Sequence, residues 1–313
     1  MPTLVWLYLT ALLYYRTSAT CVALAEALQS VSHDRLTRML QADWSGQTLL
    51  ESACRTLFVW EQGYLIIDDT VIAKPFATAM ESLAWVFSSQ EHRPVYGFSL
   101  VLLVWTDGRL RIPLGMRLWR KGGPSKYDLA LELLSYARNH LRCRPAYVLF
   151  DAWYPSRRLL KRIRDYGWYF VCRLKKNRRF NGQPLRAYRR HPYWTEAGWL
   201  TGGLKVLVVR YGAKYYATNR LTLPAPEVRR LYRLRSQIEE VIRACKDQLG
   251  LSGCQARSER AQVHHVMCSL VAFCVLERER YDRCLTVYKL KRQLSCQGRA
   301  LVLPALERLS RAA

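Results

Sequence analysis

Four residues in the C-terminal third of the chain have side chains that could act together on one ligand. They lie in the segment YRLRSQIEEVIRACK, as Tyr232, Arg235, Glu239 and Lys246. The segment has no Gly or Pro, and its apolar residues recur at helical spacing, which predicts one helix. At about 100° per residue, the four positions point within roughly a 60° arc of one another. A carboxylate flanked by a phenol and two cations suits the binding of a metal ion beside a phosphate.

Three further carboxylates follow two predicted strands. The apolar run YLIIDDT contains Asp68 and Asp69, and the run AYVLFDAWYP carries Asp151 after its apolar part. Each run is typical of a buried strand whose C-terminal end delivers an acid. Converging carboxylates repel one another unless a divalent cation lies between them. Mg²⁺ prefers oxygen ligands and can orient the attacking and leaving oxygens of a phosphoryl displacement, so we expect Mg²⁺, with Mn²⁺ as a substitute.

Together these motifs resemble those of the DDE transposases of bacterial cut-and-paste insertion sequences. One group of that family carries a Tyr-x2-Arg-x3-Glu-x6-Lys signature, which the four residues above match at every spacing. The family's first acid motif is an apolar strand, then Asp-x-Thr and a basic residue, and it matches at Asp68, Thr70 and Lys74. The second acid motif matches at Asp151, with the aromatic Trp153 beside it.

The resemblance covers roughly residues 60–280. It implies metal-dependent cleavage of DNA strands at transposon ends and transfer of the freed 3′ ends to target DNA. Its catalytic, metal-binding triad would be Asp68, Asp151 and Glu239. The partners that it implies are the inverted repeats at the transposon ends and the target DNA. Because two ends are cut in concert, the resemblance also implies a homodimer on DNA.

The same resemblance implies DNA contacts around the triad. Arg235 and Lys246 would contact the phosphates of the scissile end, and Tyr232 would position that end. Lys74 would hold a nearby phosphate. Trp153 has two interpretations: it stacks on an unpaired base, or it is a core residue.

The first acid of the triad requires a choice between two neighbours. Successive strand residues point to opposite faces, so Asp68 and Asp69 cannot both face one metal from a regular strand. The family pattern favours Asp68, and Asp69 stays open as the alternative. Glu240 lies about 100° from the basic stripe, which indicates a structural or solvent-facing residue. Two other acids fit local roles, Asp107 in a hairpin turn and Asp128 at a helix start.

Composition points to a polyanionic partner. The 313 residues carry a formal net charge of +25, and the basic residues are spread along the whole sequence. Nucleic acid is the usual partner of such a chain. Solubility alone is served better by mixed charge. The 19 Tyr and 10 Trp residues lie among these cations, as suits base stacking.

Neither the cysteines nor the N-terminus indicates export or a membrane. The 10 cysteines lie singly in apolar segments without a Cys-x2-Cys pair, as expected for reduced thiols in the cytosol. The initial run LVWLYLTALLYY lacks the features of a secretory signal, and at about 12 residues it is too short to span a bilayer. We expect a bacterial cytoplasmic protein, associated with the nucleoid when bound to DNA.

The order of predicted elements indicates an α/β fold, with an RNase H-like catalytic core, a small β insertion and a preceding N-terminal helical domain. Three strands (64–69, 96–105, 109–119) are followed by a helix (128–141), a strand (146–151), a helix (156–166) and a strand (168–174). The segments GLKVLVVR and KYYATNR predict a β-hairpin in the insertion. A helix from Pro226 carries Glu239, and helices 259–280 and 284–294 follow. The expected domains are 1–60, helical; 61–177, the first part of the core; 178–224, the insertion; and 225–313, the completion of the core.

The N-terminal domain has two interpretations. Its predicted helices are 4–15, 20–29, 33–41 and 47–60, and Ser32 is a plausible N-cap. A short basic helix after a turn could be a helix-turn-helix reader of DNA, as the family resemblance favours. The alternative is a bundle that only packs against the core.

Two other functions fit parts of the pattern. An RNase H-like nuclease or junction resolvase would use the same acids without strand transfer, but the Tyr-Arg-Glu-Lys stripe matches the transposase group. A non-enzymatic DNA-binding protein derived from a decayed transposase would keep the charge and lose an acid. All three acids are present here.

Overall fold

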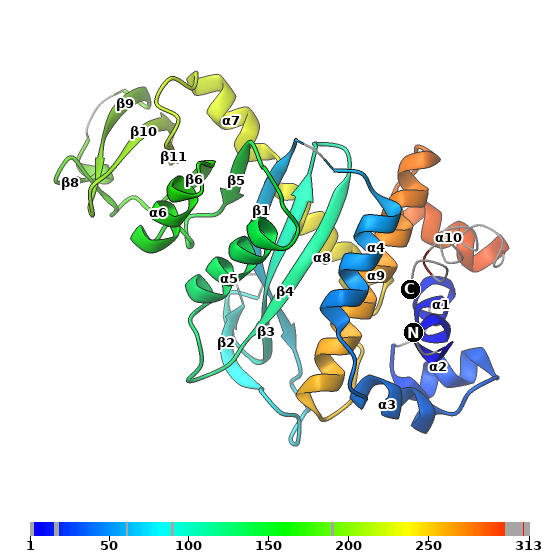
Figure 1. Cartoon of the computed structure of the whole chain (residues 1–313). Helices are drawn as coiled ribbons and strands as arrows, with labels where there is room; N and C mark the ends of the chain where they lie inside the picture. The colour runs from blue at the N-terminus through cyan, green and yellow to red at the C-terminus, as the bar shows by residue number, and fades with distance from the viewer. Residues whose placement is uncertain are drawn as a thin grey trace.

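The computed structural model describes residues 3–15, 19–60, 62–88, 91–188, 191–297 and Leu309. Its strands are β1 (Tyr64–Ala73), β2 (Ala84–Ser88), β3 (Arg93–Thr106), β4 (Arg111–Trp119), β5 (Tyr147–Phe150), β6 (Tyr169–Leu174), β7 (Arg179–Phe180), β8 (Gln183–Pro184), β9 (Tyr193–Leu200), β10 (Leu204–Tyr211) and β11 (Lys214–Thr218). Its helices are α1 (Thr3–Tyr14), α2 (Cys21–Leu28), α3 (His33–Gln41), α4 (Gly46–Leu57), α5 (Lys126–Asn139), α6 (Arg157–Asp165), α7 (Ala225–Arg233), α8 (Ser236–Gln248), α9 (Glu259–Asp282) and α10 (Val287–Gln297). The fold is a mixed α/β fold, as predicted (Figure 1).

Within these ranges the strands form one sheet of 11 strands. Its order is β2-β3-β1-β5-β6-β11-β10-β9-β7-β8, and β4 pairs with β3 off this path. Most neighbours are antiparallel, whereas β1 is parallel to β5 and β5 is parallel to β6. The parallel pairing of β1 with β5 ends at Ile67 and Phe150, and β1 then continues to Ala73 beside β3.

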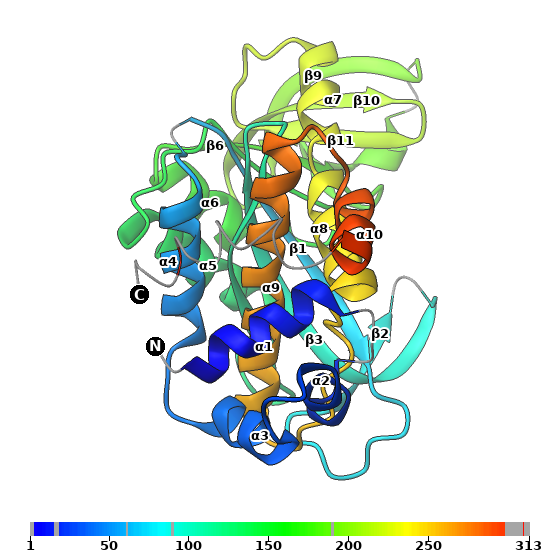
Figure 2. The same cartoon turned by 90° about the vertical axis from the view of Figure 1, so that its right-hand side faces the viewer.

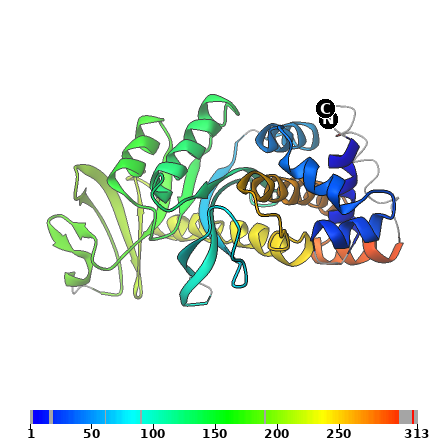
Figure 3. The ribbon, with the colours of Figure 1, turned by 90° about the horizontal axis from the view of Figure 1, so that it is seen from below.

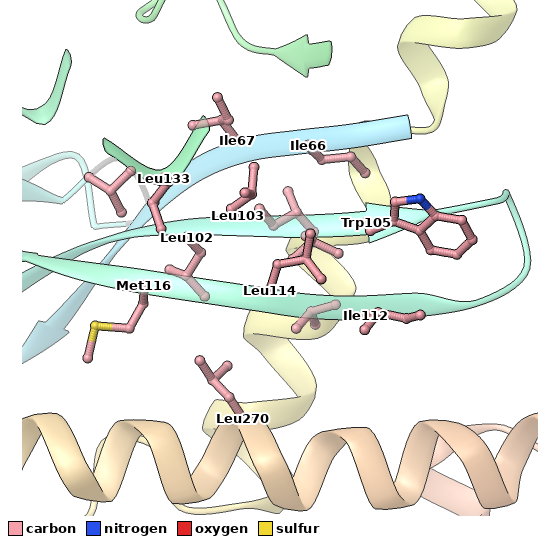
Figure 4. Packing of buried hydrophobic residues seen from close by; sticks show 14 of the residues in the cluster. Ile66, Ile67, Leu102, Leu103, Trp105, Ile112, Leu114, Met116, Leu133 and Leu270 are labelled. Carbon is pink, nitrogen blue, oxygen red and sulfur yellow. The ribbon is translucent and has the colours of Figure 1, made fainter. Parts of the chain in front are cut away.

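Helices cover both faces of the central strands. Helix α5 packs on β3 and β4, while α8 packs on β1 and α9 on β4. Figure 3 shows α5 and α6 on one side of β1 and α8 on the other. Figure 4 shows the apolar core between them, with Ile66, Leu103 and Leu114 on neighbouring strands and Leu270 on α9. These strand side chains are buried because their apolar surface is removed from water on both faces.

The N-terminal helices share this core. Helices α1, α3 and α4 all pack on α9, and Figure 2 shows α1 lying across it. From Val266 to Leu276, α9 is buried on every side, as expected of a helix that is apolar all round. The ammonium of Lys291 on α10 donates to the carbonyls of Leu12 and Leu13, at 2.5 and 2.6 Å, which caps the end of α1.

Most predicted elements are confirmed, including the hairpin, which is β10 and β11. The short strands β2, β7 and β8 and the longer β9 were not predicted. The segment 178–224 continues the main sheet, because β11 pairs with β6. None of the helices in the described ranges combines the length and apolar character that a membrane crossing needs.

Candidate active site

Asp68 and Asp151 lie side by side where the parallel pairing of β1 with β5 ends. Asp151 follows the end of β5, as predicted, whereas the prediction that Asp68 ends its strand is wrong, because β1 continues to Ala73 in its pairing with β3. Ile67 on β1 pairs with Phe150 on β5; Asp68 is the next residue within β1, and Asp151 is the first residue after β5. Hydrogen-bonded strands lie about 4.8 Å apart, so the two acids are held side by side by the sheet itself. The main-chain N–H of Trp153 donates to Oδ1 of Asp151 at 2.8 Å, which fixes that side chain at the strand end.

Glu239 reaches this site from α8 through Arg235. The guanidinium of Arg235 donates from Nη1 to Oδ2 of Asp68 at 2.5 Å and from Nη2 to Glu239. Asp68 and Arg235 are largely buried, with 16 and 17% of their side chains exposed, while Glu239 is 45% exposed. Arg235 therefore holds an acid of β1 and an acid of α8 around one positive charge.

The single helix predicted through Tyr232 and Lys246 is wrong. Helix α7 ends at Arg233, and α8 begins at Ser236. Across the break, the N–H of Arg235 bonds to Tyr232 O and that of Gln237 to Leu234 O, a tighter pattern than the α-helical one. Two side chains at the break form hydrogen bonds with strands of the sheet: Arg235 with Asp68 on β1, and Gln237 with Thr106 on β3. These contacts favour the tight turn over a continuous helix.

Asp69 lines the same cleft as Asp68 but is bound to other residues than Arg235. Its Oδ2 accepts from Lys126 Nζ at 2.5 Å, and its Oδ1 accepts from the hydroxyl of Tyr154 at 3.1 Å. This is the alternation of a regular strand, with one acid on the α8 side and its neighbour on the α5 side. Lys126 and Tyr154 were not singled out from the sequence. Tyr154 lies in the FDAWYP run, which was a signal, whereas nothing local marks Lys126.

The carboxylates of the site repel one another, which favours the binding of a cation between them. Burial raises the pKa of Asp68 to about 7; Arg235 opposes this shift, and the charges of Asp151 and Asp69 add to it. Burial by itself lowers the pKa of Arg235, but Asp68, Tyr232 and Glu239 raise it above its ordinary value. Additional positive charge between these carboxylates would relieve their repulsion.

The donor set fits a hard divalent cation, because Asp68, Asp151 and Glu239 supply only oxygen. As the side chains stand, no three His, Cys, Asp or Glu side chains in the described part of the chain form a group that could hold a metal. Asp68 and Glu239 do not form such a group because both carboxylates are paired with the guanidinium of Arg235. Metal binding would need the two acids to turn from Arg235.

A cleft of about 790 Å³ contains these groups. Its other lining residues include Lys126, Trp153, Arg243 and Lys246, and the aromatic Trp85 and Phe87 of β2. Lys246 Nζ donates to the carbonyl of Val71 on β1 at 2.9 Å, and burial lowers the pKa of this lysine. Carboxylates, cations and exposed aromatic rings thus line the same cleft.

Three residues that were predicted to contact DNA differ in how far their side chains are buried. Trp153 is 37% exposed and stacks on Tyr127, with ring centroids 4.4 Å apart and planes 4° apart, so it is not a core residue. Tyr232 is half-buried and packs edge-on against Tyr216. Lys74 is buried, and its ammonium donates to the carbonyls of Ser252 and Cys254, at 2.7 and 2.5 Å.

Lys74 thus ties the end of β1 to the segment after α8, and it does not line the cleft. Its two carbonyl partners offset the burial of its charge. The predicted phosphate contact has no support in this placement.

The remaining acids have the local roles predicted for them. Asp107 Oδ1 accepts from the N–H groups of Arg109 and Leu110, at 2.7 and 2.8 Å, in the turn before β4. Asp128 forms a capping box with Ser125 at the start of α5. Glu240 pairs with Arg111, outside the group formed by Asp68 and Glu239.

Comparison with known proteins gives a family and a fold. A family model described as "Transposase DDE domain" matches residues 60–275. Among solved structures, the chain is similar to one described as "Cryo-EM structure of piggyBac transposase synaptic complex with hairpin DNA". The TM-score is 0.57 at 13% identity, over 98% of this chain and 71% of that one. Curated protein sequences give no match.

Proposed function

The chain belongs to the transposase DDE domain family, and we propose that it cuts DNA strands at the ends of a transposable element and joins the freed 3′ ends to target DNA. One observation carries this proposal. Asp68 within β1 and Asp151 just after β5 lie side by side where the parallel pairing of these strands ends, and Arg235 holds Glu239 beside Asp68. The three acids come from distant parts of the sequence and meet in one cleft that is lined with cations.

The strand order supports an RNase H-like core. Strands β4, β3 and β1 are antiparallel neighbours, and β5 and β6 continue from β1 in parallel. In that arrangement the first acid lies on the first strand of the core and the second follows its fourth, as Asp68 and Asp151 do. The strands β7 to β11 then correspond to the insertion, and residues 1–60 to the N-terminal helical domain.

Asp68, Asp151 and Glu239 would hold one or two Mg²⁺ ions, or Mn²⁺ in their place. A bound metal supplies Lewis-acid stabilisation of the phosphate and an activated oxygen nucleophile. Asp69 is the weaker candidate for the first ligand, because Lys126 and Tyr154 hold it on the opposite side of β1.

The other residues of the cleft would bind and orient the DNA. Arg235 would contact the phosphates of the scissile end, because the guanidinium presents its donors in a planar fork that matches phosphate oxygens. Lys246 lies about two turns beyond Glu239 on the same face of α8 and would contact the next phosphates. Tyr232 would pack against the DNA end, and Trp153 would stack on an unpaired base, as its exposed ring beside Asp151 allows.

The proposed partners follow from the same chemistry. They are the inverted repeats of an element and its target DNA, in line with the net charge of +25. The structurally similar transposase is described in a synaptic complex with DNA. A homodimer on DNA, an origin in a bacterial insertion sequence and a cytoplasmic, nucleoid-associated location belong to this proposal.

The test is a plasmid assay. The DNA that flanks the coding sequence on both sides is placed around a marker gene, and the protein is added with Mg²⁺. Excision of the marker and its joining to a second plasmid are expected, and both should disappear with Asp151→Asn. Cleavage without joined products would favour an RNase H-like nuclease. Binding without cleavage by the wild-type protein would favour a DNA-binding protein that has lost its chemistry.

A further inference from the structure

Strand β2 holds two large aromatic side chains in solvent. Trp85 is 72% exposed and Phe87 is 63% exposed, while Ala84, Val86 and Ser88 between and beside them are buried. The buried side of β2 forms a small apolar cluster with Val95 on β3. This cluster fixes the register, because a slip by one residue would exchange the two sides of the strand. The pairing of β2 with β3 therefore fixes the two rings on the solvent-exposed side of β2.

The two rings lie on the same face of the sheet as Asp68. Trp85 pairs with Tyr96 on β3, and the rings are 5.6 Å apart. Two residues further along β3, Phe98 pairs with Ile72 of β1, and Asp68 lies four residues before Ile72. Paired residues share a face, and so do residues an even number apart. The face of the triad therefore continues outward to an aromatic edge.

The aromatic edge and the triad line one cleft. Trp85 and Phe87 lie in its wall together with Asp68, Asp151 and Glu239, and Arg243 and Lys246 lie along α8. Figure 3 shows the β2–β3 hairpin projecting from the body of the molecule. A polymer that occupies this cleft thus meets carboxylates, cations and exposed rings along a single path.

We propose that Trp85 and Phe87 are a base-stacking platform for the unpaired nucleotides that flank the scissile phosphate. Exposed rings among cations are the two components of single-strand binding: the cations follow the backbone, and the rings take the faces of bases. Trp85 and Phe87 are two residues apart, hence about 6.6 Å along the strand, which leaves room for one base on each ring. Bases inside a duplex are already stacked, so only splayed nucleotides offer their faces.

This inference rests on the proposed function and assigns positioning residues to its site. DNA is favoured over a second copy of this chain by charge. A copy with the same net charge of +25 would bring cations to a cleft wall that already carries Arg243 and Lys246, whereas DNA brings phosphates.

The test compares two single strands of equal length and charge, in the presence of Ca²⁺ and at fixed salt. One is oligothymidylate, and the other is an abasic oligonucleotide. The wild-type protein should bind oligothymidylate on the order of 10-fold more tightly, since stacking contributes about 1–3 kcal/mol per base. Trp85→Ala with Phe87→Ala should lower this ratio several-fold and leave the affinity for the abasic strand unchanged. Trp85→Phe with Phe87→Tyr should restore the ratio.

The control is Phe76→Ala, which removes a ring that is 95% exposed and lies outside the cleft. An unchanged ratio in the double alanine variant would overturn the proposal, and so would an equal loss of affinity for both strands. A change in oligomeric mass with an unchanged ratio would assign the edge to contact between copies. If the wild-type protein performs strand transfer but never distinguishes the two strands, the platform is wrong and the proposed function stands.

Discussion

The guanidinium of Arg235 lies between Asp68 on β1 and Glu239 on α8, with Nη1 2.5 Å from Oδ2 of Asp68. One positive charge thereby holds together two acids that would otherwise repel each other. The same contact keeps both acids from binding a metal, so Arg235 links the stability of the free protein to the state of its proposed catalytic site.

The first prediction concerns this link. Arg235→Ala should lower the free energy of unfolding by on the order of 2 kcal/mol, because a partly buried carboxylate loses its partner. In an Asp68→Asn background the same change should cost much less, since the only carboxylate that then loses Arg235 is Glu239, which is 45% exposed to solvent. Urea denaturation of the four proteins of this double-mutant cycle measures the coupling. Equal costs in both backgrounds would contradict a direct interaction.

The second prediction assigns the acids. Asp151→Asn should abolish cleavage in the plasmid assay while DNA binding stays nearly intact, because the change keeps the shape of the side chain and removes its charge. Asp68→Asn should have the same effect. Asp69→Asn should be milder, since Asp69 binds Lys126 and Tyr154. Activity lost only in the Asp69 variant would reverse this assignment.

The third prediction concerns the metal. Mg²⁺ or Mn²⁺ should support cleavage, Ca²⁺ should support binding of DNA with little cutting, and excess EDTA should stop cleavage, because the ligands are all oxygen. In the absence of DNA, Ca²⁺ should raise the melting temperature of the wild-type protein and not that of Asp151→Asn. Undiminished cleavage in excess EDTA would contradict a metal-dependent mechanism.

The fourth prediction separates a phosphate contact from a structural lysine. Lys246→Ala should lower the slope of log K against log salt by about one, as expected for one lost phosphate contact. Cleavage should fall further than binding, by on the order of 100-fold, because a misplaced scissile phosphate misses the acids. Lys74→Ala is the matched control, since that ammonium is bound to two carbonyls outside the cleft. An unchanged slope for Lys246→Ala would remove it from the DNA path.

The fifth prediction concerns acid stability. His265 on α9 is buried; its Nε2 donates to Gly250 O at 2.9 Å, so its Nδ1 accepts from the hydroxyl of Tyr8 at 2.7 Å. Burial lowers the pKa of His265 from 6.5 to about 4. The unfolded chain then binds more protons than the folded one between these values. The stability contribution of neutral His265 is therefore complete above pH 6.5 and is lost as the pH falls toward 4.

The measurement is urea denaturation of the wild-type protein and His265→Gln at pH 7.5 and 5.0. The wild-type protein should lose about 2 kcal/mol more than the variant over this interval, at about 1.4 kcal/mol per pKa unit. Subtraction of the two proteins removes the contributions of all other groups. Equal losses in both would show that His265 does not titrate in the expected way.

Local pattern alone was enough to predict most helices and the main strands, because burial on one or both faces leaves a periodic record in the sequence. It also predicted the roles of Asp107 and Asp128, whose partners lie within three residues. The short strand β2 left no such record. Its five residues alternate in burial only because β3 lies beside them.

For the site, the sequence by itself determined which residue types are available and at what spacing. The match of Asp68, Asp151 and Glu239 to a known pattern depended on nothing else. Tertiary structure alone decided the partners. Contacts between residues more than 50 positions apart hold Arg235 at Asp68, pair Asp69 with Lys126 and bury Lys74 outside the cleft. The break before α8 depends on the first of these contacts. A side chain's partner is set by the packing of distant segments, and helical or strand periodicity carries no information about it.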